Sequence, residues 1–183
     1  MDLKHQFLIA MPAMADPNFD GAVVYVCDHS EKGALGLVIN RPTELTLRTL
    51  FDRIDLKLEI APWADSPVFF GGPVQTERGF VLHDPPGTYS STLPITPEIS
   101  LTTSKDVLEA VADGSGPRRM LVTLGYSGWG AGQLEGEIQQ NAWLTVQAEP
   151  EIIFETPAEA RYNAALKLLG VDTAQLHGQA GHA

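Results

Sequence analysis

Cysteine is almost absent from this sequence. The one cysteine is Cys27, so the chain can form no internal disulfide and no Cys-x-x-Cys redox or zinc motif. No apolar run approaches the ~18 residues that a transmembrane helix needs, and the first residues lack the basic and apolar regions of a signal peptide. We therefore expect a cytoplasmic protein that does not enter a membrane.

Positive charge is also scarce. The chain has 12 Lys and Arg against 23 Asp and Glu, which gives a net charge of −11. The negative charge is evenly distributed, with a net charge of −5 in residues 1–90 and −6 in the remainder. Nucleic-acid binding depends on cations that neutralise phosphates, and Arg118–Arg119 is the one adjacent basic pair. The composition therefore argues against direct contact with nucleic acid.

Apolar residues, in contrast, are plentiful. They make up 44% of the 183 residues, enough for a buried core in one domain of ordinary size. We predict a single domain over residues 1–176, followed by a disordered tail at 177–183 that carries little besides Gly, Ala, Gln and His.

The apolar pattern predicts an α+β fold. Strand-sized apolar runs occur at 6–11, 22–27, 35–40, 68–70, 79–83, 91–95, 98–101, 119–124, 143–147 and 152–154. Helical spacing and caps predict helices at 47–54, 104–114, 133–140 and 156–170, the last begun by a capping box at 156–159. The strands do not alternate strictly with the helices, so a mixed, largely antiparallel sheet is expected.

The most unusual segment is Gly125–Gly132, which holds four of the 17 glycines. A strand, a glycine-rich loop and a helix in succession can bind phosphate. The spacing matches neither phosphate motif, however, and Glu135 and Glu137 in the first helical turn would repel an anion. Two readings remain: structural glycines with Tyr126 and Trp129 as partly buried plugs, or a cleft for another ligand.

Two residues, Ser127 and Cys27, are candidate nucleophiles. Ser127 lies in a sequence that lacks the second glycine of a nucleophile elbow, and its partner would have to be His29 or His83. Cys27 and His29 are two residues apart, so in an extended strand they would share a face. The apolar run before Cys27 predicts a buried and inert thiol instead.

The histidines allow a metal hypothesis as well. His29 follows Asp28, and His83 precedes Asp84; both pairs lie at predicted strand ends. If those strands were neighbours, the four groups would suit zinc or iron, although no short-range ligand spacing is present. Hydrogen-bonded structural histidines are the alternative, and we expect no cofactor. A further polar set around residues 133–141 is interpreted as a solvated helix face: Glu135, Glu137, Gln139 and Asn141.

Taken together, six sequence blocks resemble the bacterial YqgE/AlgH family. They occur in order over nearly the whole chain, at Phe7–Met14, Gly33–Pro42, Gly71–Val74, Arg78–His83, Gly125–Glu135 and Asn141–Leu144. The resemblance implies coiled, bifurcated sheets with flanking helices in a bacterial cytosolic protein. One branch of the family is called a transcriptional regulator of alginate production. The resemblance carries no catalytic residues over to this chain.

The leading hypothesis is a regulatory or ligand-binding protein that acts through a protein or small-molecule partner. It predicts that seven residues line one concave surface: His29, Asn40, His83, Tyr126, Trp129, Gln133 and Glu135. The alternative is a hydrolase that uses His29, His83 and nearby carboxylates, with or without a metal. The sequence leaves the ligand and the oligomeric state open.

Overall fold

The computed structural model describes residues 1–60 and 63–171; the predicted tail at 177–183 lies outside this range. The strands are β1 Gln6–Ala10, β2 Val23–Ser30, β3 Gly33–Val38, β4 Pro42–Thr46, β5 Pro67–Phe70, β6 Val74–Asp84, β7 Thr92–Pro94, β8 Ser100–Thr102, β9 Arg119–Gly130 and β10 Trp143–Gln147. The α-helices are α1 Leu47–Arg53, α2 Asp106–Asp113, α3 Gln133–Gln139, α4 Pro150–Phe154 and α5 Arg161–Leu168. Short 3₁₀ turns lie at Pro17–Phe19, Trp63–Asp65 and Ala158–Ala160.

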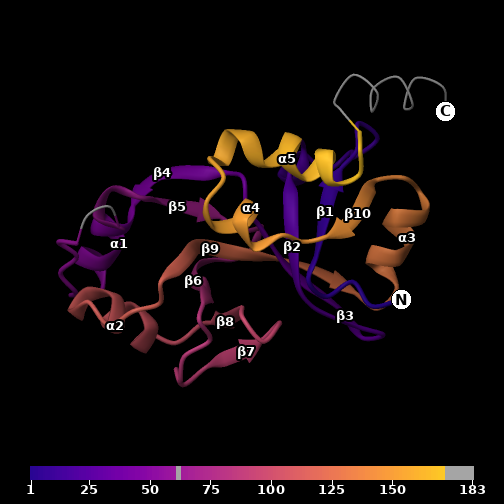
Figure 1. The fold of residues 1–183 in the computed structure, drawn as a ribbon. Coiled ribbons are helices and arrows are strands. Elements are labelled where there is room, and N and C mark those ends of the chain that lie inside the picture. The colour runs from indigo at the N-terminus through magenta and orange to yellow at the C-terminus, as the bar shows by residue number, and fades with distance from the viewer. Residues whose placement is uncertain (61–62, 172–183) are drawn as a thin grey trace.

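All these strands join in one coiled sheet (Figure 1). Its order is β10-β1-β2-β3-β9-β6-β8-β7, and β5 branches from β9 to pair with β4. The β5–β9 pair is parallel, whereas the other pairs of described strands are antiparallel. The α+β class and the mixed, largely antiparallel sheet are confirmed, and the branching at β9 is the bifurcation that the resemblance implied.

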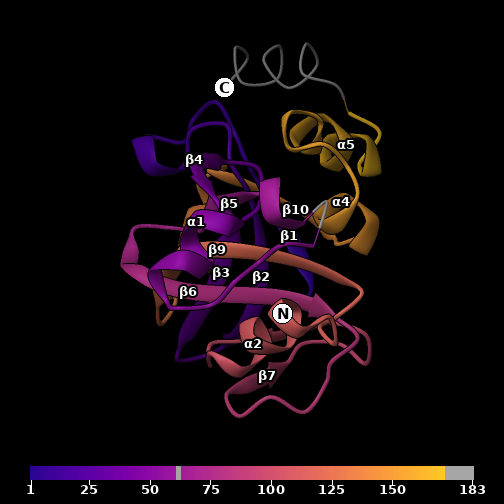
Figure 2. The same cartoon turned by 90° about the vertical axis from the view of Figure 1, so that its left-hand side faces the viewer.

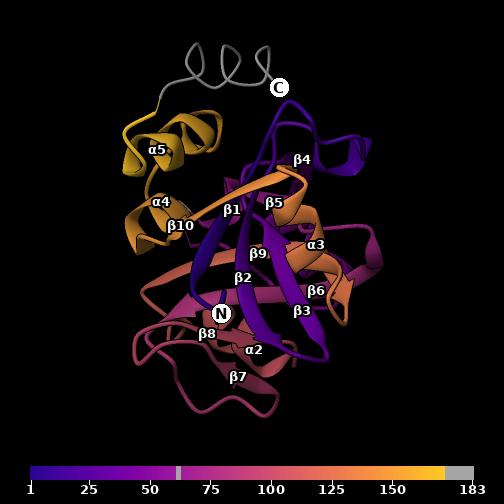
Figure 3. The same cartoon turned by 90° about the vertical axis from the view of Figure 1, so that its right-hand side faces the viewer.

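The sheet curls so that its two halves cross. Figure 3 shows β1, β2 and β3 running across the direction of β6 and β9. Three apolar clusters fill the resulting layers. One lies inside the curl under α4 and α5. The second lies under α3 on the β1–β3 half, and the third under α1 and α2 on the β6–β9 half. In Figure 2, α1 and α2 lie on the side of β6 and β9 that faces the viewer. In the part of the chain that the structure describes, no helix is long and apolar enough to cross a membrane.

The predicted glycine loop is wrong, because most of it continues β9. Residues 125–130 belong to β9, and residues 127–130 pair with Gly33–Gly36 of β3. Gly125, at φ +80°, allows the turn in the strand, and a Cβ there would lie 2.3 Å from the Gly72 carbonyl oxygen. The glycines therefore bring backbones together within a sheet, as the structural reading of these residues expected, although the local sequence does not reveal which strands pair there.

Two other local predictions are also wrong. Residues 152–154 were expected to form a strand, but they end α4. They pack apolar side chains under the sheet from a helix that begins at Pro150. The expected capping box also fails, since Thr156 donates its hydroxyl to the carbonyl of Glu151 instead of capping the next turn. In contrast, Thr46 caps α1 as predicted, accepting from the N–H of Thr49.

Candidate functional site

The carboxylate of Glu137, on α3, holds two tryptophan side chains in place. Its Oε1 accepts the indole N–H of Trp129 at 3.1 Å and that of Trp143 at 2.9 Å. Its Oε2 accepts the amide N–H of Gln133 at 3.1 Å, and Gln133 accepts the backbone N–H of Gly130 at 3.0 Å. Because buried indoles need an acceptor, Glu137 is no member of a solvated helix face. It ties the end of β9 to α3.

A cavity of about 340 Å³ opens beside this carboxylate and is called the Trp129 cavity below. It is lined by Ala13, Met14, Ala15, Asp16, Phe19, Pro73, Gly128, Trp129, Gln133, Glu137, Gln140 and Ala142. The lining includes two carboxylates, Asp16 and Glu137, and two aromatic rings, but no Lys, Arg or His. The Phe19 ring stacks on Trp129 with centroids 6.0 Å apart. The cavity thus combines an apolar wall with negative charge, which suits an organic cation.

Glu135, on the same helix, contacts the sheet through His29. The His29 Nε2 lies 3.3 Å from Glu135 Oε2, and its Nδ1 accepts the backbone N–H of Leu3 at 3.0 Å. Because Nδ1 accepts, the ring proton sits on Nε2 and is donated to the carboxylate. The Glu135 backbone N–H lowers the pKa of its own carboxyl, and the His29 contact adds to that. The pair therefore anchors α3 and the N-terminal residues to β2.

Cys27 and His29 do not share a face, so that expectation is wrong. The β2–β3 register shifts between Val26 and Asp28, where one extra residue of β2 is accommodated in a bulge. Cys27 packs inside the curl and is buried, whereas His29 contacts α3 on the opposite face. Burial raises the pKa of the Cys27 thiol, first through desolvation and then through Asp28. The thiol is held in its unreactive, protonated form.

Tyr126 and Asn40 both have structural contacts, in different parts of the sheet. The Tyr126 ring packs edge-on against Phe80, with centroids 5.4 Å apart, and lines an open hollow that it shares with Trp129. Asn40 closes the turn before β2, accepting from the N–H of Val23 and donating to the Gly21 carbonyl, both at 2.9 Å. Asn40 therefore shapes the turn and is not among the residues lining the Trp129 cavity.

His83 lies in a different part of the molecule. Its Nδ1 is 2.9 Å from the Pro85 carbonyl, which can only accept, so this nitrogen carries a proton. Burial lowers the pKa of His83 and outweighs the Pro85 carbonyl and Asp84, which raise it. The ring is therefore neutral at neutral pH, and Nε2 accepts the hydroxyl of Thr102 at 2.6 Å. Both ring nitrogens of the buried His83 therefore have hydrogen-bond partners.

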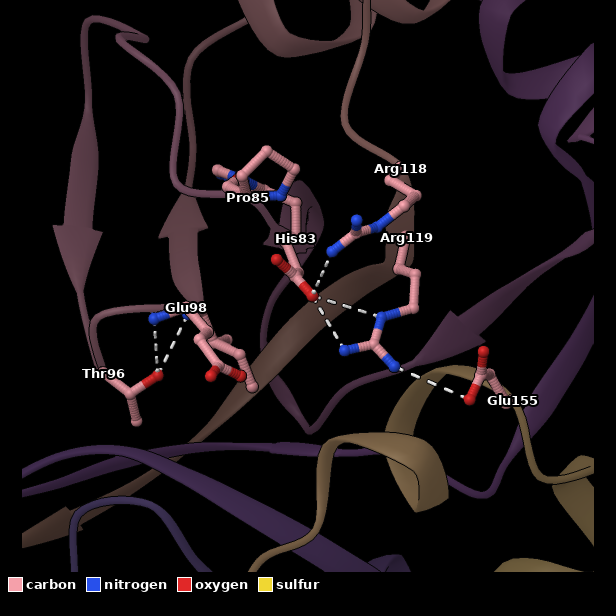
Figure 4. Close-up of polar contacts among 9 residues, drawn as sticks. His83, Pro85, Thr96, Glu98, Arg118, Arg119 and Glu155 are labelled. Atoms are coloured by element: carbon pink, nitrogen blue, oxygen red, sulfur yellow. Dashed lines mark hydrogen bonds and ion pairs between the residues drawn. The ribbon is translucent and has the colours of Figure 1, made fainter.

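The carboxylate of the neighbouring Asp84 forms ion pairs with both adjacent arginines, Arg118 and Arg119. Figure 4 shows Arg118 and Arg119 pointing toward the carboxylate that follows His83. Arg119 donates to it at 2.7 and 3.2 Å, and its other nitrogen lies 3.6 Å from Glu155. The charge of Arg119 is therefore offset by two carboxylates.

The single surface expected for all seven residues is not formed. His29 pairs with Ala34, which faces Trp129 on β9, while His83 faces Met120 on the same strand. Positions 120 and 129 stand at opposite ends of β9, and an extended segment of that length spans about 30 Å. The two histidines therefore cannot act on one substrate or share a metal. Over residues 1–60 and 63–171, no cluster of His, Cys, Asp or Glu is arranged to hold a metal ion.

Ser127 gives no support to a nucleophile elbow. Its hydroxyl is buried and donates to the Gly71 carbonyl at 3.0 Å. In the pairing of β9 with β3, it faces Gly36. The hydroxyl therefore stabilises the crossing of the backbones at β9.

Of the seven predicted residues, Trp129 and Gln133 line the Trp129 cavity, and Glu135 and His29 anchor the helix beside it. Sequence reasoning missed Asp16, Phe19 and the central role of Glu137. One signal was available: two tryptophans flank a short helix that holds a glutamate, and buried indoles require acceptors.

Comparison with known proteins identifies the family. A family model described as AlgH-like matches residues 7–174. The chain belongs to the AlgH-like family. The chain is 67% identical over 183 residues to a UPF0301 protein of Cupriavidus pinatubonensis, covering 100% of this chain and 96% of the relative. It is also 67% identical over 182 residues to a UPF0301 protein of Bordetella petrii, covering 90% of that protein.

Solved structures agree with the fold. The solution structure of the AlgH protein from Pseudomonas aeruginosa matches with a TM-score of 0.83 and 51% identity, covering 100% of this chain and 97% of that one. A crystal structure of a protein from Corynebacterium diphtheriae matches with a TM-score of 0.71 at 18% identity, over 91% of this chain and 87% of that one. The second likeness concerns the fold alone.

Proposed function

We propose that this AlgH-like protein is a regulatory ligand-binding protein that recognises a positively charged group in the Trp129 cavity. The group is an ammonium or guanidinium carried by a small molecule or by a protein partner. The observation that carries the proposal is the lining: Asp16 and Glu137 supply negative charge, Phe19 and Trp129 supply aromatic surface, and no lining residue is cationic.

The chemistry of the lining selects among ligands. A cation near the two carboxylates gains Coulomb energy of about 1 kcal/mol per charge pair in contact with solvent. A phosphate there would meet repulsion, and the chain as a whole carries −11. The apolar wall formed by Met14, Phe19 and Pro73 favours a cation attached to an apolar body.

A ligand in the Trp129 cavity contacts segments that come from distant parts of the chain. Apart from Pro73, the cavity is lined by three segments that are distant in sequence: residues 13–19, Gly128 and Trp129 of β9, and α3 with residues up to Ala142. A ligand that contacts all three stabilises their present arrangement by mass action. A change in the position of α3 or the 13–19 segment would then be the regulatory signal passed to a partner.

The experiment is a titration of the protein with benzylamine, followed by ¹H–¹⁵N correlation spectra. Benzyl alcohol and benzoate serve as neutral and anionic counterparts. The indole N–H signals of Trp129 and Trp143 report directly, since both bonds end on Glu137. We expect saturable shifts with benzylamine and much smaller shifts with the other two compounds.

Two variants test how much the negative charges of Asp16 and Glu137 contribute to benzylamine binding. Asp16→Asn keeps the acceptor for the N–H of Asn18, and Glu137→Gln keeps an oxygen for the indoles. Each should weaken benzylamine binding by up to about fivefold. Asp52→Asn removes an equal charge from an exposed position on α1 and should change nothing. Equal binding of benzyl alcohol, or equal losses in all three variants, would contradict the proposal.

A further inference from the structure

A second cavity, of about 350 Å³, lies between the sheet and the α4–α5 segment and is called the Arg161 cavity below. It is lined by Pro42, Leu47, Trp63, Ser66, Pro67, Phe69, Met120, Leu121, Val122, Ile153, Phe154, Ala158, Glu159 and Arg161. Most of these side chains are apolar, and Arg161 is the single cation among them. This volume falls in the range of small-molecule sites.

Arg161 is buried without a carboxylate partner. The residue is only 6% exposed, yet within the described residues no carboxylate oxygen lies within 4.0 Å of its guanidinium. Its charge is held by backbone and by an aromatic face instead. Nε donates to the Thr156 carbonyl at 2.8 Å, Nη1 donates to the Ile39 carbonyl, and Cζ lies 4.9 Å from the centre of the Phe69 ring.

The cation persists at physiological pH. Burial lowers the pKa of Arg161 to about 10, and Glu159 opposes that shift. Glu159 itself is exposed, at the edge of the cavity. Arg119, which stacks over Phe154 at 5.2 Å, is already offset by Asp84 and Glu155. The cation of this cavity therefore belongs to Arg161, and Glu159, at the edge of the cavity, offsets part of its charge.

One end of the guanidinium remains available. A guanidinium has more N–H groups than these two carbonyls accept, and Nη2 donates to no group in the described chain. Nor is Nη2 among the fully enclosed polar atoms that lack a partner there. Since the residue is otherwise buried, this end is open toward the cavity that Arg161 lines.

We propose that the Arg161 cavity binds a small organic monocarboxylate with an apolar body. The carboxylate accepts from Nη2 of Arg161, and the apolar body lies against Phe69, Ile153 and Phe154. Arg161 matches the one negative charge of such a ligand, while the exposed Glu159 lies at the edge of the cavity. The apolar walls exclude strongly hydrated anions such as inorganic phosphate. The proposal is independent of the Trp129 cavity, which carries charge of the opposite sign.

The test is a titration with hexanoate, with 1-hexanol and hexylamine as neutral and cationic counterparts. Binding is followed by backbone ¹H–¹⁵N shifts of Phe69, Ile153 and Ala158. We expect saturable shifts with hexanoate at these positions and at least about tenfold weaker binding of 1-hexanol. Arg161→Met should weaken hexanoate binding by about tenfold, because it removes the charge and keeps an apolar stem. Arg53→Met, at an exposed position on α1, should have no effect.

Ala158→Phe is a second variant, which tests the same site if Arg161→Met does not fold. The new ring would occupy the cavity while leaving the Arg161 contacts with Ile39 and Thr156 intact, so hexanoate binding should be lost. The proposal is overturned if 1-hexanol binds as tightly as hexanoate, or if Ala158→Phe binds hexanoate like the parent chain.

Discussion

At the residue scale, Glu137 has the largest number of specific side-chain partners near the candidate site. Two buried indoles and the amide of Gln133 donate to its carboxylate. A buried donor that loses its acceptor costs more free energy than the hydrogen bond itself contributed. The stability of the Trp129 cavity therefore depends on this side chain.

Glu137→Ala should reduce the free energy of unfolding by about 3 kcal/mol, since both indole N–H groups lose their acceptor. Glu137→Gln should cost roughly 1 kcal/mol, because its amide oxygen can still accept from them. Gln139→Ala, at an exposed position on the same helix, should be nearly neutral. Urea denaturation measures all three, and equal losses in Glu137→Ala and Gln139→Ala would contradict this account.

His83 gives a prediction for pH. Burial lowers its pKa below the ordinary value of 6.5, so the unfolded chain binds a proton that the folded chain resists. Stability should fall as the pH drops below about 6.5, by at most ~1.4 kcal/mol per pH unit for one group. His83→Gln should be less stable at pH 7.5, because it loses imidazole hydrogen bonds, but it should lose less on acidification.

The comparison is the urea midpoint of each protein at pH 7.5 and pH 5.5. His5 also has a pKa lowered by burial, so the variant keeps part of the pH dependence. An unchanged difference between the two pH values in His83→Gln would show that His83 does not titrate as described.

At the element scale, the N-cap of α1 was predictable because its physics is local. Thr46 accepts from the N–H of Thr49 within one turn of helix. Thr46→Ala should lower the free energy of unfolding by about 1 kcal/mol, whereas Thr46→Ser should stay close to the parent. Thermal or urea unfolding checks this, and equal stability of all three chains would contradict it.

The glycine-rich end of β9 was not predictable, because its conformation is set by distant strands. Gly72, at φ +152°, lies so close to β9 that a Cβ would stand 2.2 Å from the Tyr126 carbonyl. The sequence of residues 125–132 alone gives no indication of this close contact with Gly72. The bulge near Cys27 and the helical state of 152–154 were missed for the same reason, since packing across the sheet decided both.

Gly72→Ala should therefore be strongly destabilising, by roughly 3 kcal/mol or more, because backbone strain and a backbone clash add together. Gly79→Ala is the matched control. A Cβ at Gly79, on β6, would meet nothing within 4 Å, so this change should be nearly neutral. Comparable unfolding midpoints for the two variants would contradict the close approach of backbones at β9.

At the scale of the whole molecule, the class of fold followed from apolar runs, caps and the family resemblance. The grouping of the candidate residues did not, because it depends on strand order. Trp129 and His29 meet near α3 through β2, β3 and β9. His83 is carried to the far end of β9 by its pairing with Met120. Long-range order of this kind is encoded in packing and not in spacing along the chain.

The proposed function depends on recognition of a cation by the Trp129 cavity. The most direct measurement is the set of intermolecular nuclear Overhauser effects between bound benzylamine and the protein. We expect contacts from the benzyl ring to the Met14 methyl group and the Trp129 ring, and we expect these contacts to be lost in Asp16→Asn combined with Glu137→Gln. Contacts confined to another surface, or no saturable binding of benzylamine, would contradict it.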